Sequence, residues 1–172
     1  MDIRPARMKD VPEIAAVHVR SWQAAYRGLL PQAYLDGLDP AQRTGQWERV
    51  LSTAGWSQGG TLVADAGGRL SGFVSYGPAR DDDADSGQAG EIYAIYLLPA
   101  AWGEGTGRQL MAAALGRLGE AGFGQVILWV LDSNVRARRF YEAGGWHADG
   151  TVKQDDSFGV PITEVRYRRS LP

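Results

Sequence analysis

The chain has 172 residues and a mass of 18.6 kDa, and with 44% hydrophobic residues it can bury the core of one domain over residues 1–172. Its 18 Lys and Arg residues against 20 Asp and Glu residues leave a net charge of -2, which lacks the basic excess of a nucleic-acid-binding protein. It has no cysteine, two histidines and no apolar run that could form a leader or a membrane span. We therefore expect a cytoplasmic protein with no disulfide, no metal site and no nucleic-acid or membrane partner.

The first third of the chain predicts a strand followed by three helices. The expected ranges are 2–5, 11–28, 29–38 and 39–52. Asp10 can cap the first of these helices, and Gly28 is expected to end it. Ile14, His18 and Trp22 lie at i, i+4 and i+8, so they share one face of that helix.

The remainder of the chain alternates strands with helices. A hairpin is predicted over 61–77, with its turn at Gly67 and Gly68, and an acidic loop follows at 81–85. The later strands are expected at 91–99, at 125–131, near 146 and at 162–170, with helices at 106–121 and 134–144. Apolar residues predict the inner face of the first of these helices: Leu110, Met111, Ala114, Leu115 and Leu118. This order predicts an α+β (α/β layered) fold with a mixed sheet.

The stretch WGEGTGRQL, residues 102–110, has glycine at positions 103, 105 and 107, so its backbone is little covered by side chains. It lies between a strand that is expected to end at Pro99 and a helix that is expected to begin near Thr106. Backbone N–H groups at a helix N-terminus favour an anion, so the sequence indicates a phosphate-bearing ligand. A Walker A loop needs Lys before Ser or Thr, which is missing, and a Rossmann fingerprint needs glycine where Arg108 and Leu110 stand. A tight turn without a ligand is the alternative.

Two blocks, EIYAIYLLPAAWGEGTGRQLM and ILWVLDSNVRARRFYEAGGW, resemble the GNAT superfamily of acyl-CoA-dependent N-acyltransferases. The family's pyrophosphate loop, Gln/Arg-x-x-Gly-x-Gly/Ala, aligns with residues 102–107, and Trp102 stands where the family usually has Gln or Arg. The second block fits N-x-x-A-x-x-F-Y-x-x-x-G-[FW] at six positions: Asn134, Ala137, Phe140, Tyr141, Gly145 and Trp146.

The resemblance implies a mixed, mostly antiparallel central sheet that is splayed between its fourth and fifth strands and flanked by helices. The pantetheine arm of acetyl-CoA would lie between the strands at 91–98 and 125–131. The cofactor-binding residues implied are Tyr96, Leu97, Leu98, Trp102, Gly103, Glu104, Gly105, Thr106, Gly107, Arg108, Asn134, Arg138 and Tyr141. Arg136, Arg138 and Arg139 could reach the 3′-phosphate or merely face solvent.

The resemblance also implies direct attack of a primary amine on the thioester. A backbone N–H near Leu97 would polarise the carbonyl, and Tyr141 would protonate the departing thiolate as general acid. An alkylamine with a pKa of roughly 10 must first lose a proton. Glu91 is the first candidate base and His18 the second. The alternatives are an exposed glutamate at the end of a strand and a histidine packed within its helix.

The acceptor is expected to be a small amine-bearing molecule. Trp22, Tyr26 and Tyr93 are candidate lining residues, with Trp47 as a further possibility, because aromatic faces attract cations. The alternative is that Trp22 and Tyr26 are core residues. The loop at 81–85 could concentrate a cationic acceptor or simply be solvated. The resemblance also implies that the chain could form a homodimer, since relatives are often dimers. A non-catalytic acyl-CoA-binding module and an acetyltransferase for protein N-termini or lysines are the alternative functions.

Two further motifs are unsuited to their usual roles. Residues 55–59 match the G-x-S-x-G nucleophile elbow, but they lie between a helix and a strand instead of between a strand and a helix. The acidic loop begins like an EF-hand, but Ser86 and Ile92 stand where glycine and glutamate are needed. We therefore expect neither a serine hydrolase nor a calcium site.

Overall fold

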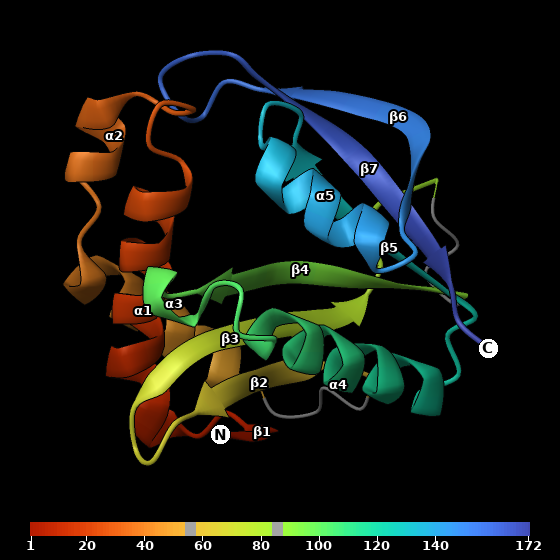
Figure 1. The fold of residues 1–172 in the computed structure, drawn as a ribbon, viewed down its shortest axis with the longest axis horizontal. Coiled ribbons are helices and arrows are strands. Elements are labelled where there is room, and N and C mark those ends of the chain that lie inside the picture. Colours follow the sequence, from red (N-terminus) through yellow and green to blue (C-terminus); the bar gives the residue numbers. More distant parts are fainter. Residues whose placement is uncertain (54–57, 84–87) are drawn as a thin grey trace.

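The computed structural model describes residues 1–53, 58–83 and 88–172 (Figure 1). Residues 55–57 of the elbow-like motif and residues 84–85 of the acidic loop lie outside the described residues. The elements are β1 (Asp2–Pro5), η1 (Met8–Asp10), α1 (Val11–Ala25), α2 (Gln32–Asp36), α3 (Pro40–Ser52), β2 (Gly60–Asp65), β3 (Leu70–Pro78), β4 (Ala89–Leu97), η2 (Pro99–Ala101), α4 (Thr106–Glu120), β5 (Gln125–Leu131), α5 (Val135–Ala143), β6 (His147–Asp155) and β7 (Ile162–Ser170).

The strands form a seven-stranded sheet in the order β1-β2-β3-β4-β5-β7-β6. Neighbouring strands are antiparallel except for β4 and β5, which are parallel. A parallel pair needs a long crossover, and α4 provides it between the two strands. The predicted mixed, mostly antiparallel sheet flanked by helices is confirmed.

The sheet opens between its fourth and fifth strands. The β4–β5 register runs only from Ala89 opposite Gln125 to Ile92 opposite Leu128. Beyond that point β4 continues along β3 to Leu97, while β5 continues along β7 to Leu131. Each strand stays paired on its outer side, so the two diverge and leave inward-facing backbone groups unpaired with each other. The predicted splay is confirmed, and it is visible in Figure 1 as the divergence of β4 from β5.

Helices cover both faces of the first half of the sheet. Residues alternate between faces along a strand, so Leu62 and Val74 pack with the inner face of α4 while Val63 and Phe73 pack with α1 and α3. All five apolar residues predicted for the inner face of α4 are buried there. The α4 layer and the α1–α3 layer therefore fix β4 from opposite sides.

Two predicted element ends are corrected by local geometry. The helix predicted to reach Gly28 ends at Ala25, because Gly28 adopts a φ of 79° in the following turn, in which the Leu30 N–H bonds to the Tyr26 carbonyl. The strand predicted at 91–99 begins at Ala89 and ends at Leu97, because Pro99 starts the short helix η2. No helix among the described residues is long and apolar enough to cross a membrane.

Candidate active site

A cavity of about 400 Å³ occupies the space where β4 and β5 diverge. One end is formed by the loop after β4, the middle by the two strands, and the far wall by α5. Its lining includes these predicted cofactor-binding residues: Tyr96, Leu97, Trp102, Gly103, Gly105, Gly107, Arg108, Asn134 and Tyr141. We call this cavity the main groove.

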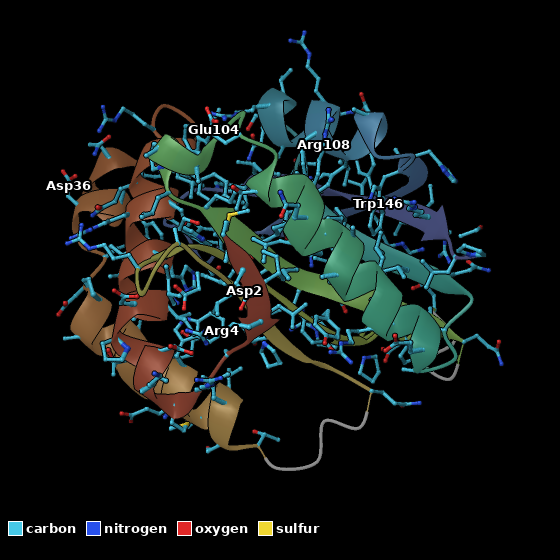
Figure 2. All side chains as sticks on the ribbon, turned by 60° about the horizontal axis from the view of Figure 1, so that its bottom comes forward. Asp2, Arg4, Asp36, Glu104, Arg108 and Trp146 are labelled. Atoms are coloured by element: carbon cyan, nitrogen blue, oxygen red, sulfur yellow. The ribbon has the colours of Figure 1, made fainter. Side chains whose placement is uncertain are left out.

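The loop end of the main groove is built from glycine backbone. Gly103 and Gly105 have φ angles of 81° and 83°, which L-residues rarely adopt, and a Cβ added at either position would meet no atom within 4 Å. Gly105 is the N-cap of α4, so the N–H groups of the first helical turn lack partners within the helix. Glu104 and Arg108 lie at this end of α4 (Figure 2). The loop can therefore bind phosphate oxygens through its backbone.

The edge of β4 offers further backbone donors to the main groove. The Leu98 N–H bonds to the Ser71 carbonyl across to β3. Successive residues of a strand direct these groups to opposite sides, so the N–H and carbonyl of Leu97 point into the gap. The Leu97 carbonyl accepts a hydrogen bond from Trp102 Nε1 at 3.0 Å, as this geometry requires. An extended arm could pair with this edge.

Helix α5 places Tyr141 on the wall of the main groove. Asn134 caps the helix, because its Oδ1 accepts the Ala137 N–H at 3.1 Å. The Tyr141 ring is 9% exposed and contacts the rings of Phe140, Trp146 and Tyr167. Burial, and then the nearby Tyr96 phenol, raise the pKa of Tyr141. Its hydroxyl is therefore protonated at neutral pH and can donate a proton.

The other predicted cofactor-binding residues lie apart from the lining of the main groove. The Thr106 hydroxyl donates to Met1 Sδ at 3.4 Å, and Leu98 packs beside the α1–α3 core. Arg138 binds the Tyr167 hydroxyl and the Asp132 carboxylate at 3.0 and 2.6 Å. Glu104 is exposed. Of the three arginines of α5, Arg136 lines the cavity.

A second cavity, of about 150 Å³, adjoins the main groove. The two cavities share five lining residues at the divergence of β4 and β5, namely Tyr26, Ile92, Tyr93, Tyr96 and Trp129. The rest of its lining includes Trp22, Arg80, Glu91, Lys153, Phe158 and Glu164. We call it the side pocket. It contains the three predicted acceptor residues, Trp22, Tyr26 and Tyr93.

Glu91 lies on the wall of the side pocket and is ion-paired. Its carboxylate is 3% exposed and accepts both the Arg80 backbone N–H, at 2.9 Å, and the Arg80 guanidinium, at 2.8 Å. The Arg80 side chain is 64% exposed and lies 4.1 Å over the Tyr93 ring. The alternative of an exposed glutamate at the strand end is wrong, since Glu91 is buried where its strand begins to diverge.

His18 and Trp47 belong to the core and line neither cavity. Trp47 Nε1 donates to His18 Nδ1 at 3.2 Å, and the His18 ring stacks on Tyr96 with 5.2 Å between ring centroids. Burial, and then the charge of Arg43, lower the pKa of His18 to about 4. His18 is therefore neutral at pH 7, and the packed-histidine alternative fits the structure.

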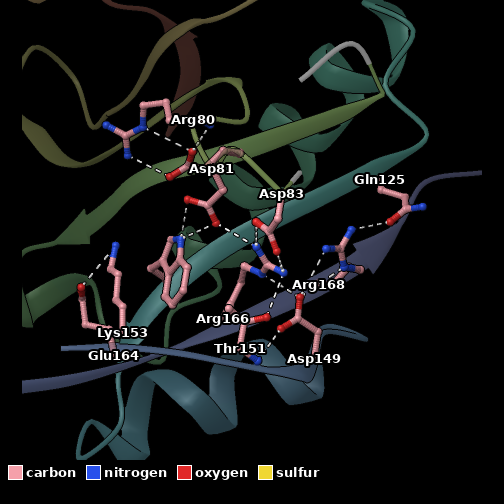
Figure 3. Close-up of polar contacts among 12 residues, drawn as sticks. Arg80, Asp81, Asp83, Gln125, Asp149, Thr151, Lys153, Glu164, Arg166 and Arg168 are labelled. Carbon is pink, nitrogen blue, oxygen red and sulfur yellow. Dashed lines mark hydrogen bonds and ion pairs between the residues drawn. The ribbon is translucent and has the colours of Figure 1, made fainter. Parts of the chain in front are cut away.

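The acidic loop is held by a buried arginine (Figure 3). Arg166 is 4% exposed and binds Asp81, Asp83 and Asp149 at 2.9, 2.7 and 2.7 Å. Asp81 also accepts Trp129 Nε1 at 3.0 Å. The hypothesis that this loop is merely solvated is wrong for Asp81, which is 21% exposed, whereas Asp83 is ion-paired and 63% exposed. Arg166 faces three carboxylates, so it offsets only part of the negative charge that would attract a cationic acceptor.

Several residues of the side pocket carry no signal in the sequence. They are Arg80, from the loop after β3, Trp129 from β5, Phe158 from the β6–β7 connection and Glu164 from β7. None carries a local motif. Trp129 was expected on the strand at 125–131 beside the gap, and in the structure it follows the last β5 residue that pairs with β4.

Comparison with known proteins identifies the family. The profile of the Acetyltransferase (GNAT) family matches residues 20–146. Over 167 residues, covering 95% of this chain and 89% of its relative, the chain is 36% identical to the uncharacterized N-acetyltransferase YuaI of Bacillus subtilis. It is 31% identical to a probable N-acetyltransferase of Mycobacterium tuberculosis, with 99% and 95% of the two chains covered. The chain belongs to the GNAT acetyltransferase family.

Solved structures have the same fold. The PaiA N-acetyltransferase of Thermoplasma acidophilum, solved in complex with coenzyme A, has a TM-score of 0.77 at 19% identity, with 99% and 98% of the two chains covered. YncA of Salmonella typhimurium, a putative acetyltransferase solved with its cofactor acetyl-CoA, has a TM-score of 0.72 at 20% identity, with 100% and 94% covered. Both comparisons confirm the fold predicted from the sequence.

Proposed function

We propose that this protein is a cytoplasmic enzyme that transfers acetyl from acetyl-CoA to the primary amine of a small acceptor. The observation that carries the proposal is the continuity of the main groove. A glycine loop at a helix N-terminus leads along an unpaired strand edge to a protonated phenol, at a point where a second pocket joins. A diphosphate, an extended arm and an acceptor need these three environments in this order.

The residues of the main groove fit acetyl-CoA. The backbone of Gly103, Gly105 and Gly107, with the first turn of α4, would hold the diphosphate. The edge of β4 near Tyr96 and Leu97 would pair with the pantetheine arm, with Asn134 on the opposite side. When bound, acetyl-CoA supplies the acetyl group as an activated thioester.

Two backbone and side-chain donors act on the reacting thioester. The Leu97 N–H, which points into the gap, would donate to the carbonyl oxygen as negative charge develops there. Tyr141 would donate its proton to the departing sulfur. Burial raises the pKa of Tyr141, so the phenol holds a proton at neutral pH that it can donate to the sulfur.

Glu91 would take the proton of the attacking amine. It is a buried carboxylate of the side pocket, and Arg80 donates hydrogen bonds to both of its oxygens. Glu164, which is 22% exposed and 3.4 Å from Lys153, is a second carboxylate on the same wall. Because Glu91 lies close to the residues shared by the two cavities, it is the proposed base.

The side pocket favours a small acceptor. Its volume of about 150 Å³ is below the roughly 300–1,000 Å³ typical of sites for drug-sized ligands. Trp22, Tyr26 and Tyr93 would pack against the body of the acceptor, and Tyr26 and Tyr96 present phenols at the junction with the main groove. A primary amine with a short side chain fits this space better than an aminoglycoside.

The decisive experiment measures release of free CoA thiol from acetyl-CoA by the purified protein, with and without pooled amino acids, polyamines, aminoglycosides and short peptides. Release that depends on an acceptor supports the proposal, and the pool is then divided until one compound remains. Stabilisation by acetyl-CoA without release from any pool would favour the alternative, a non-catalytic acyl-CoA-binding module. Absence of both would reject both functions.

A further inference from the structure

The first position of the glycine loop departs from the family pattern in a way that the structure explains. Trp102 stands where Gln or Arg is usual, and its indole cannot offer a charge to phosphate. Its Nε1 is already committed to the Leu97 carbonyl at 3.0 Å, which fixes the ring at the end of β4. The indole ring of Trp102 therefore forms a flat platform on the wall of the main groove.

Arg136 occupies that platform. Its Cζ lies 3.6 Å from the centroid of the Trp102 ring, which places the planar guanidinium in van der Waals contact with the ring face. Arg136 is the second residue of α5, directly after the capping Asn134 and Val135. The pair therefore joins the glycine loop to α5 across the main groove.

The stacked guanidinium keeps its hydrogen-bonding capacity. Stacking uses the face of the group, whereas its five N–H donors lie in its plane. Among residues 1–53, 58–83 and 88–172, Arg136 forms no ion pair with a carboxylate. Arg138, on the same helix, is bound to Asp132 and Tyr167 instead. Arg136 thus brings an oriented, uncompensated charge to the groove.

We propose that Arg136, held on the face of Trp102, binds the diphosphate of acetyl-CoA and supplies the cationic contact that the side chain at position 102 has lost. This inference rests on the proposed function. The diphosphate is favoured over the 3′-phosphate because Trp102 immediately precedes the glycine run at residues 103–107, which is the backbone phosphate site. An arginine fixed on residue 102 lies beside that loop.

The test compares the affinities of the full-length protein for CoA, 3′-dephospho-CoA and pantetheine by titration calorimetry. Arg136→Met should weaken CoA and 3′-dephospho-CoA by the same factor, about tenfold to a hundredfold, because both ligands retain the diphosphate. Pantetheine, which has no phosphate, should bind the variant and the parent protein alike. Arg139→Met is the matched control, since it removes an exposed arginine of α5 that does not line the groove, and it should change none of the affinities.

A swap tests the role of the platform. In the Arg136→Met background, Trp102→Arg returns a cation to the position where the family usually has one, and it should recover most of the lost CoA affinity. Trp102→Leu alone should weaken CoA about threefold to tenfold, because the guanidinium loses the ring that orients it. Unchanged melting temperatures would show that these variants fold.

The outcomes separate the inference from the function on which it rests. A loss confined to CoA would assign Arg136 to the 3′-phosphate and overturn the inference, and so would equal affinity of Arg136→Met and the parent for all three ligands. If the parent protein binds neither CoA nor 3′-dephospho-CoA, the proposed function itself fails.

Discussion

The main groove and the side pocket differ in the chemical groups that they offer to a ligand. The main groove combines aromatic side chains with exposed backbone, namely two glycines at positive φ, the first turn of α4 and the inward edge of β4. The side pocket presents side chains, six of them aromatic, together with the Arg80–Glu91 and Lys153–Glu164 ion pairs. Backbone geometry suits a ligand that every family member shares, whereas side chains can be replaced one at a time to suit one acceptor.

The largest effect should be on cofactor affinity, when the glycine loop of the main groove is disrupted. Gly105→Val should abolish cofactor binding, with a loss of at least a hundredfold, because valine is strained at a φ of 83° and its side chain would extend into the phosphate site. Calorimetry with CoA measures it. Gly116→Val on the same helix, where a Cβ also meets nothing within 4 Å, should retain affinity. Wild-type binding by Gly105→Val would mean that the loop has been misassigned.

The next effect concerns the chemistry where the two cavities meet. Tyr141→Phe should slow turnover by about tenfold to a thousandfold while acetyl-CoA affinity stays nearly unchanged, because only the hydroxyl is lost. Steady-state kinetics with the acceptor found by screening, beside a binding titration, separates the two quantities. Unchanged turnover would remove Tyr141 from the mechanism.

Breaking the Arg166 network, in which Asp81 binds Trp129 of the side pocket, should cost stability instead of cofactor affinity. Arg166→Met leaves Asp81, Asp83 and Asp149 facing one another without their shared cation, so the free energy of unfolding should fall by about 3 kcal/mol. CoA affinity measured below the unfolding transition should stay within about twofold of the parent, since none of these residues lines the main groove. Arg117→Met, which breaks an exposed pair at 3.5 Å, should change stability by less than about 1 kcal/mol. Equal destabilisation by the two variants would contradict the role given to Arg166.

The last effect is a pH dependence of stability that comes from His18, in the core behind both cavities. The pKa of His18 is lowered from 6.5 to about 4, so the unfolded chain binds its proton first as pH falls. Stability from His18 is fully present above pH 6.5 and is lost progressively towards pH 4, by up to about 3 kcal/mol. Glutamine can accept the Trp47 N–H but does not titrate. The His18→Gln variant should therefore lose less stability than the parent protein between pH 7 and pH 4.5, as measured by urea unfolding. Equal losses of stability in the two proteins would show that His18 does not contribute.

The sequence could predict local patterns but not contacts between residues that lie far apart in the chain. The glycine loop before α4 and the start of a helix at 134 are local patterns, and they were predicted by residue number. The splay of the sheet was implied by the family resemblance. Arg166 binds Asp81 and Asp83 across 85 and 83 positions of the chain, and Arg80 reaches Glu91 around a loop, so no periodicity or motif indicates either contact. The resemblance could not predict the Trp102–Arg136 stack, because it involves a departure from the family pattern.

The short contact between β4 and β5 has a consequence for the dynamics of the molecule. Four register pairs join the two halves of the sheet, with the Arg166 network as a second connection on the acceptor side. Amide protons at the contact between β4 and β5 should exchange through sub-global opening, while those within β2–β3 should exchange only through complete unfolding. A ligand that pairs with β4 and contacts α5 would reinforce this contact, so CoA should slow exchange on both sides of it. The cofactor would then stabilise the contact between the two halves of the sheet as well as donate acetyl groups.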